Sequence, residues 1–295
     1  MKIMRIAKSL VPEAAMRRMR EARVIRNRSR IRKKSEQQTH LCLSPVNRVE
    51  HYFHCIFDLI LPLHCVLQEL DDGATVSIPE FGIFSDRIPQ IFGPQVAICE
   101  REEFPHSEAL PLLGMNPQFT RFELADLISL KRRLLDAFDI DHETRANKVL
   151  LIERLPPNEY FTSHAVKKGA GASRRSIPNH EELRQSLEAT IPNEFEFHNV
   201  RLEELEFRDQ VELFHSAAAI IGQHGAGLAN CAWMRQAQLV LEITHRPELQ
   251  HFQRLSHLMK HEHVLHISDG SHAPLNIPQL INMWTQALAK MPAKN

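Results

Sequence analysis

The sequence lacks the features of several common protein classes. Its five cysteines form no CxxC pair and no regular spacing, which argues against a disulfide scaffold or a structural zinc. No stretch reaches the roughly 18 uncharged apolar residues of a membrane span, because Asp58, Pro62 and His64 interrupt the most apolar segment, 55–67. The N-terminal residues carry no apolar core of signal-peptide length. These absences predict a cytoplasmic protein that does not cross a membrane.

Common nucleotide and metal signatures are also missing. The sequence has neither the GxGxxG of nicotinamide sites nor the GK[ST] ending of a P-loop. Its 18 histidines include no HExxH, and the group His257, His261, His263 and His266 has no third ligand at a fixed spacing. We expect these histidines to be solvated, and we expect no metal cofactor.

The net charge is zero only as an average. Residues 1–36 hold thirteen Lys and Arg against three acidic residues, a charge of +10, and the rest of the chain carries −10. Apolar residues between the arginines predict one or two basic helices. Such a segment can bind the inner face of an anionic membrane, each basic residue contributing about 1 kcal/mol. The alternatives are a solvated, partly disordered arm or nucleic-acid binding, but no aromatic residue is interleaved to stack on bases.

Length and periodicity predict an α/β protein. A chain of 295 residues fits two domains, and short apolar runs alternate with amphipathic stretches, which is typical of parallel βαβ units. We expect a basic tail at 1–38, a first α/β domain at 39–145, a more regular Rossmann-like domain at 146–295, and a hinge near 139–147. The expected strands are 75–78, 96–98, 148–152, 196–198, 218–221, 239–243 and 264–267. The expected helices are 51–70, 122–138, 180–189, 208–216, 228–234, 249–260 and 278–289.

The most informative segment is AAAIIGQHGAGLAN, residues 217–230. Its apolar run suits a central parallel strand, and Gly225 and Gly227 permit close approach to the backbone. A strand, a glycine turn and a helix start together form an anion site, usually for phosphate. His224 stands in the turn, where its imidazole can donate to a phosphate or sugar oxygen. Some glycine turns of this kind bind nothing.

This segment, followed by Glu242, resembles the signature of glycosyltransferase family 61. Three further segments are similar to the family in order and spacing: HYFHCIFDLILPL at 51–63, KVLLIER at 148–154 and RRSIPNHEEL at 174–183. The resemblance covers about residues 45–270. It implies two Rossmann-like domains facing each other across a cleft, the glycosyltransferase B architecture, with inversion at the anomeric carbon and generally no essential metal.

The resemblance also implies substrates. The donor would be a nucleotide sugar, with a UDP-sugar expected first, and the acceptor a hydroxyl of a glycan or lipid-linked molecule in cell-surface polysaccharide synthesis. Two alternatives are a pyruvyl transferase acting on polysaccharide and a non-catalytic subunit of a glycan assembly complex. The many charged residues of the matching segments argue against the second.

The donor-side residues follow from strand ends and helix starts. Arg154 ends an apolar strand and can clamp a diphosphate, although a salt bridge with Glu153 or Asp141 is an alternative. Arg175 precedes Asn179, which has the spacing of a capping box with Glu182 and is favoured as structural. Glu242, also at a strand end, can accept ribose hydroxyls. The predicted donor-binding residues are Arg154, Arg175, Asn179, Gln223, His224, Gly225, Gly227 and Glu242.

His51, His54 and Asp58 fall on one face of the expected helix 51–70. Inverting transfer needs a base for the acceptor hydroxyl, and a histidine oriented by a carboxylate suits that role near pH 7. We predict His54 and Asp58 as catalytic, leaving open which of them is the base. Bracing of the helix by the same pair is the alternative.

Overall fold

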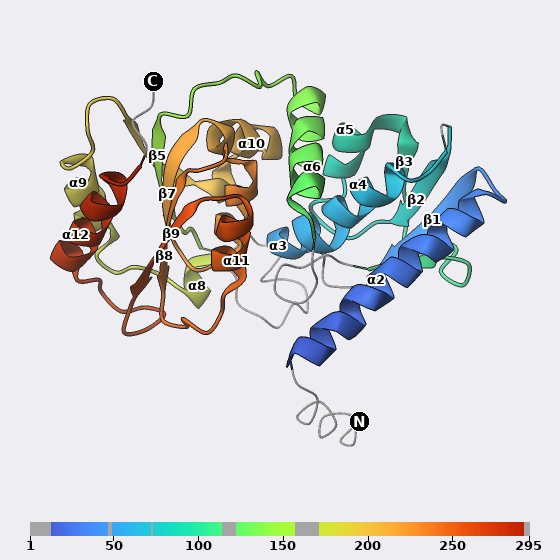
Figure 1. Cartoon of the computed structure of the whole chain (residues 1–295), viewed down its shortest axis with the longest axis horizontal. Helices are drawn as coiled ribbons and strands as arrows, with labels where there is room; N and C mark the ends of the chain where they lie inside the picture. The colour runs from blue at the N-terminus through green and yellow to red at the C-terminus, as the bar shows by residue number, and fades with distance from the viewer. Residues whose placement is uncertain (1–12, 47–48, 72, 114–121, 157–170, 292–295) are drawn as a thin grey trace. The chain divides into compact units, whose positions relative to one another are not determined.

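A computed structural model of the chain describes residues 13–46, 49–71, 73–113, 122–156 and 171–291. The chain forms two compact units, Met1–Leu130 and Lys131–Asn295, each built around one parallel sheet (Figure 1). The division falls inside helix α6 (Leu124–Ala137), ahead of the polar stretch 139–147. Two parallel sheets with helices confirm the predicted α/β fold, while their facing across a cleft stays a prediction.

The first unit has four parallel strands in the order β3-β2-β1-β4. Strands β2 and β3 match the expected runs, whereas β1 and β4 were not predicted. Both unpredicted strands contain proline, Pro45 at the end of β1 and Pro111 in the edge strand β4, and proline cannot donate to a sheet ladder. The bounds are β1 (His40–Pro45), β2 (Thr75–Pro79), β3 (Val96–Cys99) and β4 (Leu110–Leu112).

The expected helix 51–70 is one helical stretch with a widened middle. It consists of α3 (Tyr52–Cys55), the π-helical turn η1 (Ile56–Ile60) and α4 (Leu61–Leu67). Pro62 in α4 lacks the N–H that an α-helical bond would need. All residues from Cys55 to Leu67 are buried, which explains why this segment is so apolar. π-Helical turns of this kind often occur at functional sites.

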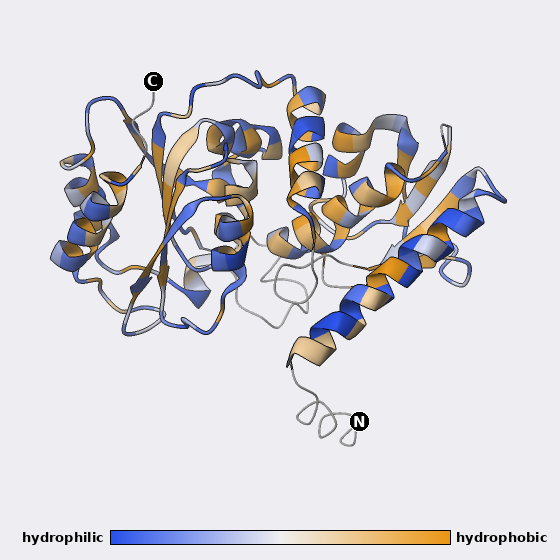
Figure 2. Cartoon of the chain, viewed as in Figure 1, coloured by the Kyte–Doolittle hydropathy of each residue, from blue (hydrophilic) through white to orange (hydrophobic). Residues whose placement is uncertain are grey.

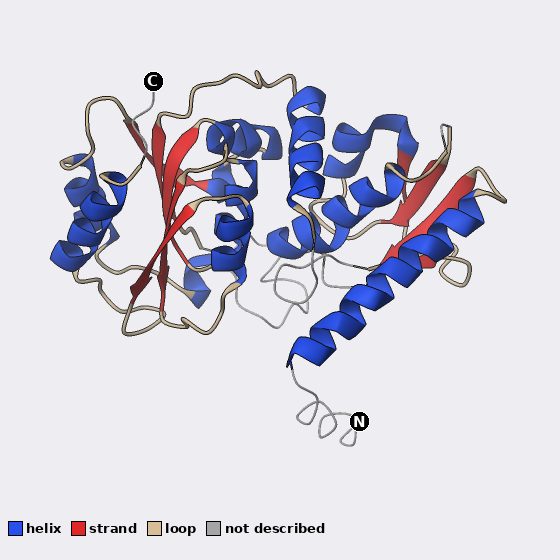
Figure 3. Cartoon of the chain, in the orientation of Figure 1, coloured by secondary structure: helices blue, strands red, loops and turns tan. Residues whose placement is uncertain are grey.

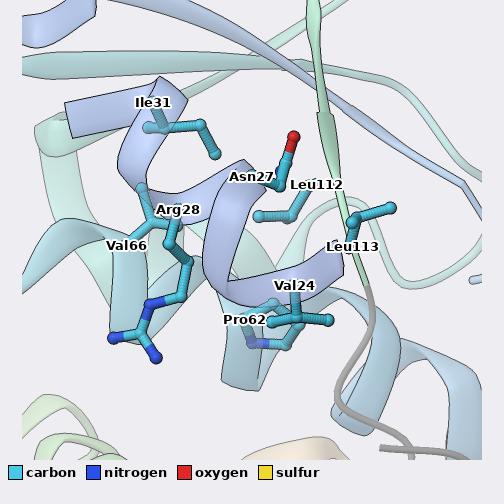
Figure 4. A pocket seen from close by; sticks show the side chains of 8 residues that line it. All are labelled: Val24, Asn27, Arg28, Ile31, Pro62, Val66, Leu112 and Leu113. Carbon is cyan, nitrogen blue, oxygen red and sulfur yellow. The ribbon is translucent and has the colours of Figure 1, made fainter. Parts of the chain in front are cut away.

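The basic segment forms helix α2 (Glu13–Ser35), which packs against β1, β4 and α4. Its own side chains Val24 and Ile31 are buried, and Lys34 donates to the Glu108 carbonyl at 3.1 Å. Residues 13–35 are therefore part of the first unit, and a disordered arm is the wrong description of them. Figure 2 shows hydrophilic residues along most of α2. Figure 4 shows the small hollow beneath α2, lined mainly by apolar side chains such as Pro62 and Leu112.

Two shorter helical segments complete the first unit. They are α5 (Arg87–Phe92), which was not predicted, and the 3-10 turn η2 (Gly93–Gln95). Pro89 lies inside α5, and a proline in the interior of a short segment argues against a helix, which explains why α5 was not predicted.

The second unit has five parallel strands in the order β6-β5-β7-β8-β9. Each contains one of the expected runs. From β5 the chain adds β6 on one side and then crosses back to add β7, β8 and β9 on the other side. The carboxyl ends of β5 and β7 therefore form a topological switch point. The strands are β5 (Lys148–Glu153), β6 (Glu196–Arg201), β7 (Ala217–Gln223), β8 (Leu239–Thr244) and β9 (Glu262–Ile267).

Helices cover both faces of this sheet (Figure 3). One face packs against α9 and α12, around the buried Leu183, Leu280 and Trp284. The other face meets η4, α10 and α11. The helical segments are α8 (Gly171–Arg174), α9 (His180–Glu188), η3 (Leu202–Glu204), α10 (Phe207–His215), η4 (Ala226–Trp233), α11 (His251–Leu258) and α12 (Ile277–Leu288).

The segment after the glycine turn differs from the prediction of an α-helix at 228–234. It is the 3-10 segment η4. Asn230 donates from its side chain to the Gly227 carbonyl at 3.1 Å, and such local bonds compete with α-helical pairing.

Among all helices of the described ranges, none has the length and apolar character of a membrane span.

Candidate functional site

The switch point of the second sheet carries the two residues that the sequence singled out. Arg154 follows the last residue of β5, and His224 follows the last residue of β7. In open parallel sheets, ligands bind outside the carboxyl ends of the strands at this position. The strand order thus gives an independent reason to look for a site here.

Two arginines converge on one carbonyl of the glycine turn. Arg175 Nη1 donates to the His224 carbonyl oxygen at 2.7 Å, and Arg154 Nη1 donates to the same oxygen at 3.3 Å. Arg175 is buried. Arg154 Nε is buried and has no hydrogen-bond partner among the described residues. Two guanidinium groups are thus held at the same carbonyl oxygen.

The predicted alternative for Arg154, a salt bridge with Glu153 or Asp141, does not occur among the described residues. Glu153 instead pairs with Arg201, whose Nε lies 2.9 Å from Glu153 Oε2, and accepts from Asn199 at 2.7 Å. The charge of Arg154 is therefore not neutralised by its neighbour in the sequence.

Positive charge gathers around Arg175. Burial, together with the charges of Arg174, Arg154 and Arg246, lowers the pKa of Arg175 to about 10, with Glu242 acting in the opposite direction. A cation surrounded by cations favours the binding of an anion. Arg246 was not predicted, although its place two residues after the end of β8 is the signal that identifies it.

Two glycines allow this packing for steric reasons. A Cβ at Gly225 would collide with Arg154 Nη1, and a Cβ at Gly227 would lie 2.8 Å from Leu202 Cδ1. Gly225 is therefore the position that lets the guanidinium of Arg154 approach the turn.

The His224 ring is held by a buried carboxylate. Its Nδ1 hydrogen-bonds Glu242 Oε1, and Glu242 Oε2 accepts from His263 Nε2 at 2.9 Å. Burial opposes ionisation of Glu242, but the hydrogen bonds from both histidines outweigh it and hold its pKa below the ordinary value. Both oxygens of Glu242 are occupied, so the predicted contact with ribose hydroxyls would require one of these bonds to break.

Three histidines predicted to be solvated are buried, and that prediction was wrong for them. The His263 side chain is only 2% exposed, and His261 and His266 are also buried. Burial lowers the pKa of His261 to about 4, which keeps it neutral. Of the predicted group, His257 is exposed.

Gln223 and Asn179 have mainly bracing roles. Gln223 Nε2 donates to the carbonyls of Ser176 and Ser271 at 3.3 and 3.1 Å. Asn179 occupies the N-cap position of α9, but its side chain accepts from Leu275 N at 2.8 Å and donates to Leu275 O at 3.0 Å. Asn179 Nδ2 also donates to Glu182 Oε2 of its own helix at 3.1 Å, so the side chain links the start of α9 both to that helix and to Leu275.

In the first unit, His54 and Asp58 form the predicted pair. His54 Nδ1 lies 2.5 Å from Asp58 Oδ2. The His54 side chain is 37% exposed and that of Asp58 only 1%. Asp58 belongs to the π-helical turn η1, and its Oδ1 is buried with no partner in the described part of the chain. The pair therefore has one accessible member, an imidazole oriented by a buried carboxylate.

Within the described residues, no group of three His, Cys, Asp or Glu side chains has the arrangement of a metal site.

Comparison with curated proteins found no match. The family model described as Glycosyltransferase 61 matches residues 52–241, more than half of the chain. This match includes the π-helical turn, the strand that ends before Arg154 and the glycine turn, so the chain belongs to glycosyltransferase family 61.

Proposed function

We propose that the second unit binds the diphosphate of a nucleotide sugar at the carboxyl ends of β5 and β7. The observation that carries this proposal is the convergence of Arg154 and Arg175 on the His224 carbonyl. Their remaining N–H groups, with the ring of His224, would neutralise the phosphates as the leaving nucleotide gains charge. In such a site, side chains would neutralise the phosphate charge that a divalent ion neutralises in other transferases. We therefore propose that the transfer is metal-independent.

The reaction we propose is sugar transfer with inversion. His54 Nδ1–H donates to Asp58, which leaves Nε2 to take the proton of the acceptor hydroxyl as that oxygen attacks the anomeric carbon. The nucleotide diphosphate leaves from the opposite face. Burial of Asp58 favours His54 as the base and Asp58 as the group that orients it.

The proposed substrates follow from the family. We propose a UDP-sugar as donor and a glycan or lipid-linked hydroxyl as acceptor, in cell-surface polysaccharide synthesis. A cytoplasmic protein docked on the inner face of the membrane fits this role. In support, the exposed face of α2 carries basic residues together with Met19 and Ile25, which are 66% and 65% exposed.

Calorimetric titration with UDP-, GDP- and CMP-sugars, with and without EDTA, tests the proposal. We expect one nucleotide class to bind and to release its sugar to an acceptor, with little change on chelation. Failure of all three classes to bind would refute the proposed donor site. Turnover abolished by EDTA and restored by manganese would refute metal independence.

A further inference from the structure

Three adjacent strands of the second sheet each contribute one member of a buried hydrogen-bonded chain. His224 follows β7, Glu242 lies in β8 and His263 lies in β9. Glu242 stands between the two histidines, and the side chains of all three are at most 5% exposed. Since His263 lies outside the matched residues 52–241, the family match assigns it no role.

The carboxylate fixes where the protons are. An ionised carboxylate only accepts hydrogen bonds, so His224 Nδ1 and His263 Nε2 must both carry a proton. His224 Nε2 is then the nitrogen left to face a ligand, and it makes no hydrogen bond among the described residues. A neutral His224 can accept a hydrogen bond at this nitrogen, and an imidazolium can donate one there.

Further contacts hold the main chain and the ring of His224. Its carbonyl accepts from both arginines, and its ring contacts Phe252 edge-on at a centroid distance of 5.0 Å. The remaining freedom of the ring is rotation about χ angles, which the bond to Glu242 restrains. The second oxygen of Glu242 is in turn held by His263 Nε2 at 2.9 Å.

We propose that His263 is a positioning residue that acts through Glu242 to fix the tautomer and orientation of His224 in the donor-phosphate site. This inference rests on the proposed function for its ligand, a nucleoside diphosphate. The titratable and charged groups next to His224 and Glu242 are Arg154 and Arg175 at the His224 carbonyl, His245 and His251 near the His224 ring, and Cys231 near Glu242.

The test compares His263→Ala, His263→Gln and the matched control His257→Ala. The amide of glutamine can donate to Glu242 from nearly the place of His263 Nε2, whereas alanine leaves a buried oxygen unpaired. His257 is exposed on the last turn of α11, so its loss should change nothing. The folded state of each variant is checked by thermal melting.

The first readout is the imidazole nitrogen NMR spectrum of the nucleotide-free protein across pH. In the wild type, we expect protonated Nδ1 in His224 and protonated Nε2 in His263. In His263→Ala, the His224 titration should shift, and His263→Gln should restore it. A wild-type spectrum with unprotonated His263 Nε2 would overturn the inference even if no variant folds.

The second readout is calorimetric affinity for UDP as the probe. We expect His263→Ala to bind UDP about tenfold more weakly, as for a lost hydrogen bond to a charged group, with substantial recovery in His263→Gln. Unchanged affinity, or weaker binding with an unchanged His224 spectrum, would overturn the inference. Absence of UDP binding to the wild type would instead count against the proposed donor, and the NMR result would still decide the hydrogen-bonded chain.

Discussion

The guanidinium of Arg175 donates to the main-chain carbonyl of His224, 49 residues further along the chain, at 2.7 Å. This bond joins the segment before α9 to the glycine turn after β7. Arg154 reaches the same oxygen from the end of β5. Three strand and helix ends are thus fixed around one carbonyl, and the donors not used there define the proposed phosphate site.

Loss of either arginine should weaken nucleotide binding. We expect Arg154→Ala and Arg175→Ala to cost about 1.5–3 kcal/mol of binding free energy each, the usual contribution of a hydrogen bond to a charged group. Calorimetry with the nucleotide that binds the wild type measures this cost. Arg201→Ala is the matched control, because Arg201 ends β6 of the same sheet but pairs with Glu153. Equal affinity in the arginine variants and the control would place the phosphates elsewhere.

A methyl group at Gly225 should act through Arg154. The Cβ of Gly225→Ala would occupy the space of Arg154 Nη1, and the flexible side chain of Arg154 must then move away from the turn. We expect nucleotide affinity to fall about as far as in Arg154→Ala, with little further loss in the double variant, because both changes remove the same contact. Fully additive losses in the double variant would show that the glycine and the arginine act independently.

The parts predicted best from the sequence are those set by local pattern. In the second unit, short apolar runs and amphipathic helices alternate without interruption, so each strand was located. The residues after strands β5 and β7 could be assigned to one sheet edge, because parallel strands end on the same side. Arg154 followed directly from this rule, and His224 followed from its place in the glycine turn after β7.

The parts missed depend on contacts between segments far apart in the chain. The burial of His263 is set by the strand order that places β9 beside β8, and the residue pattern of β9 alone looks half exposed. The docking of α2 rests on few buried side chains, among them Val24 and Ile31, seven residues apart in a basic helix. Such sparse apolar positions give little amphipathic signal.

Glu242 should make stability depend on pH in acid. Because its folded pKa lies below the ordinary value of 4.5, its contribution is fully present above that value and is lost as the pH falls through the folded pKa. The wild type should therefore exceed Glu242→Gln in free energy of unfolding at pH 7, and the difference should narrow below about pH 4.5. Urea denaturation over this range measures it. Glu204→Gln, with a side chain 58% exposed, should show no comparable narrowing.

The exposed face of α2 should bind anionic membranes. Deleting 1–36 would also remove the buried Val24 and Ile31 from the first unit, so substitutions on the exposed face are the cleaner change. We expect reversal of four exposed arginines to Glu to release the protein from vesicles rich in anionic lipid, as high salt should. The four are Arg18, Arg23, Arg26 and Arg30.

The control reverses four exposed basic residues of the second unit and should leave vesicle binding unchanged. They are Arg132, Arg145, Arg208 and Lys260. Co-sedimentation with vesicles measures both sets. If the α2 variant sediments as fully as the wild type, membrane docking by this face is wrong.

The last prediction separates chemistry from donor binding. His54→Ala should lower turnover by roughly 10²–10⁴-fold, the usual contribution of a positioned base, and leave nucleotide affinity nearly unchanged, because the proposed phosphate ligands all belong to the second unit. Asp58→Asn should be milder, since it removes the orienting charge and keeps the imidazole.

His106→Ala, an exposed histidine of the first unit, serves as the control. Initial rates beside calorimetry, on variants with wild-type melting behaviour, distinguish these outcomes. Full turnover in both His54→Ala and Asp58→Asn would make the pair structural, and a larger loss in Asp58→Asn than in His54→Ala would make Asp58 the base despite its burial.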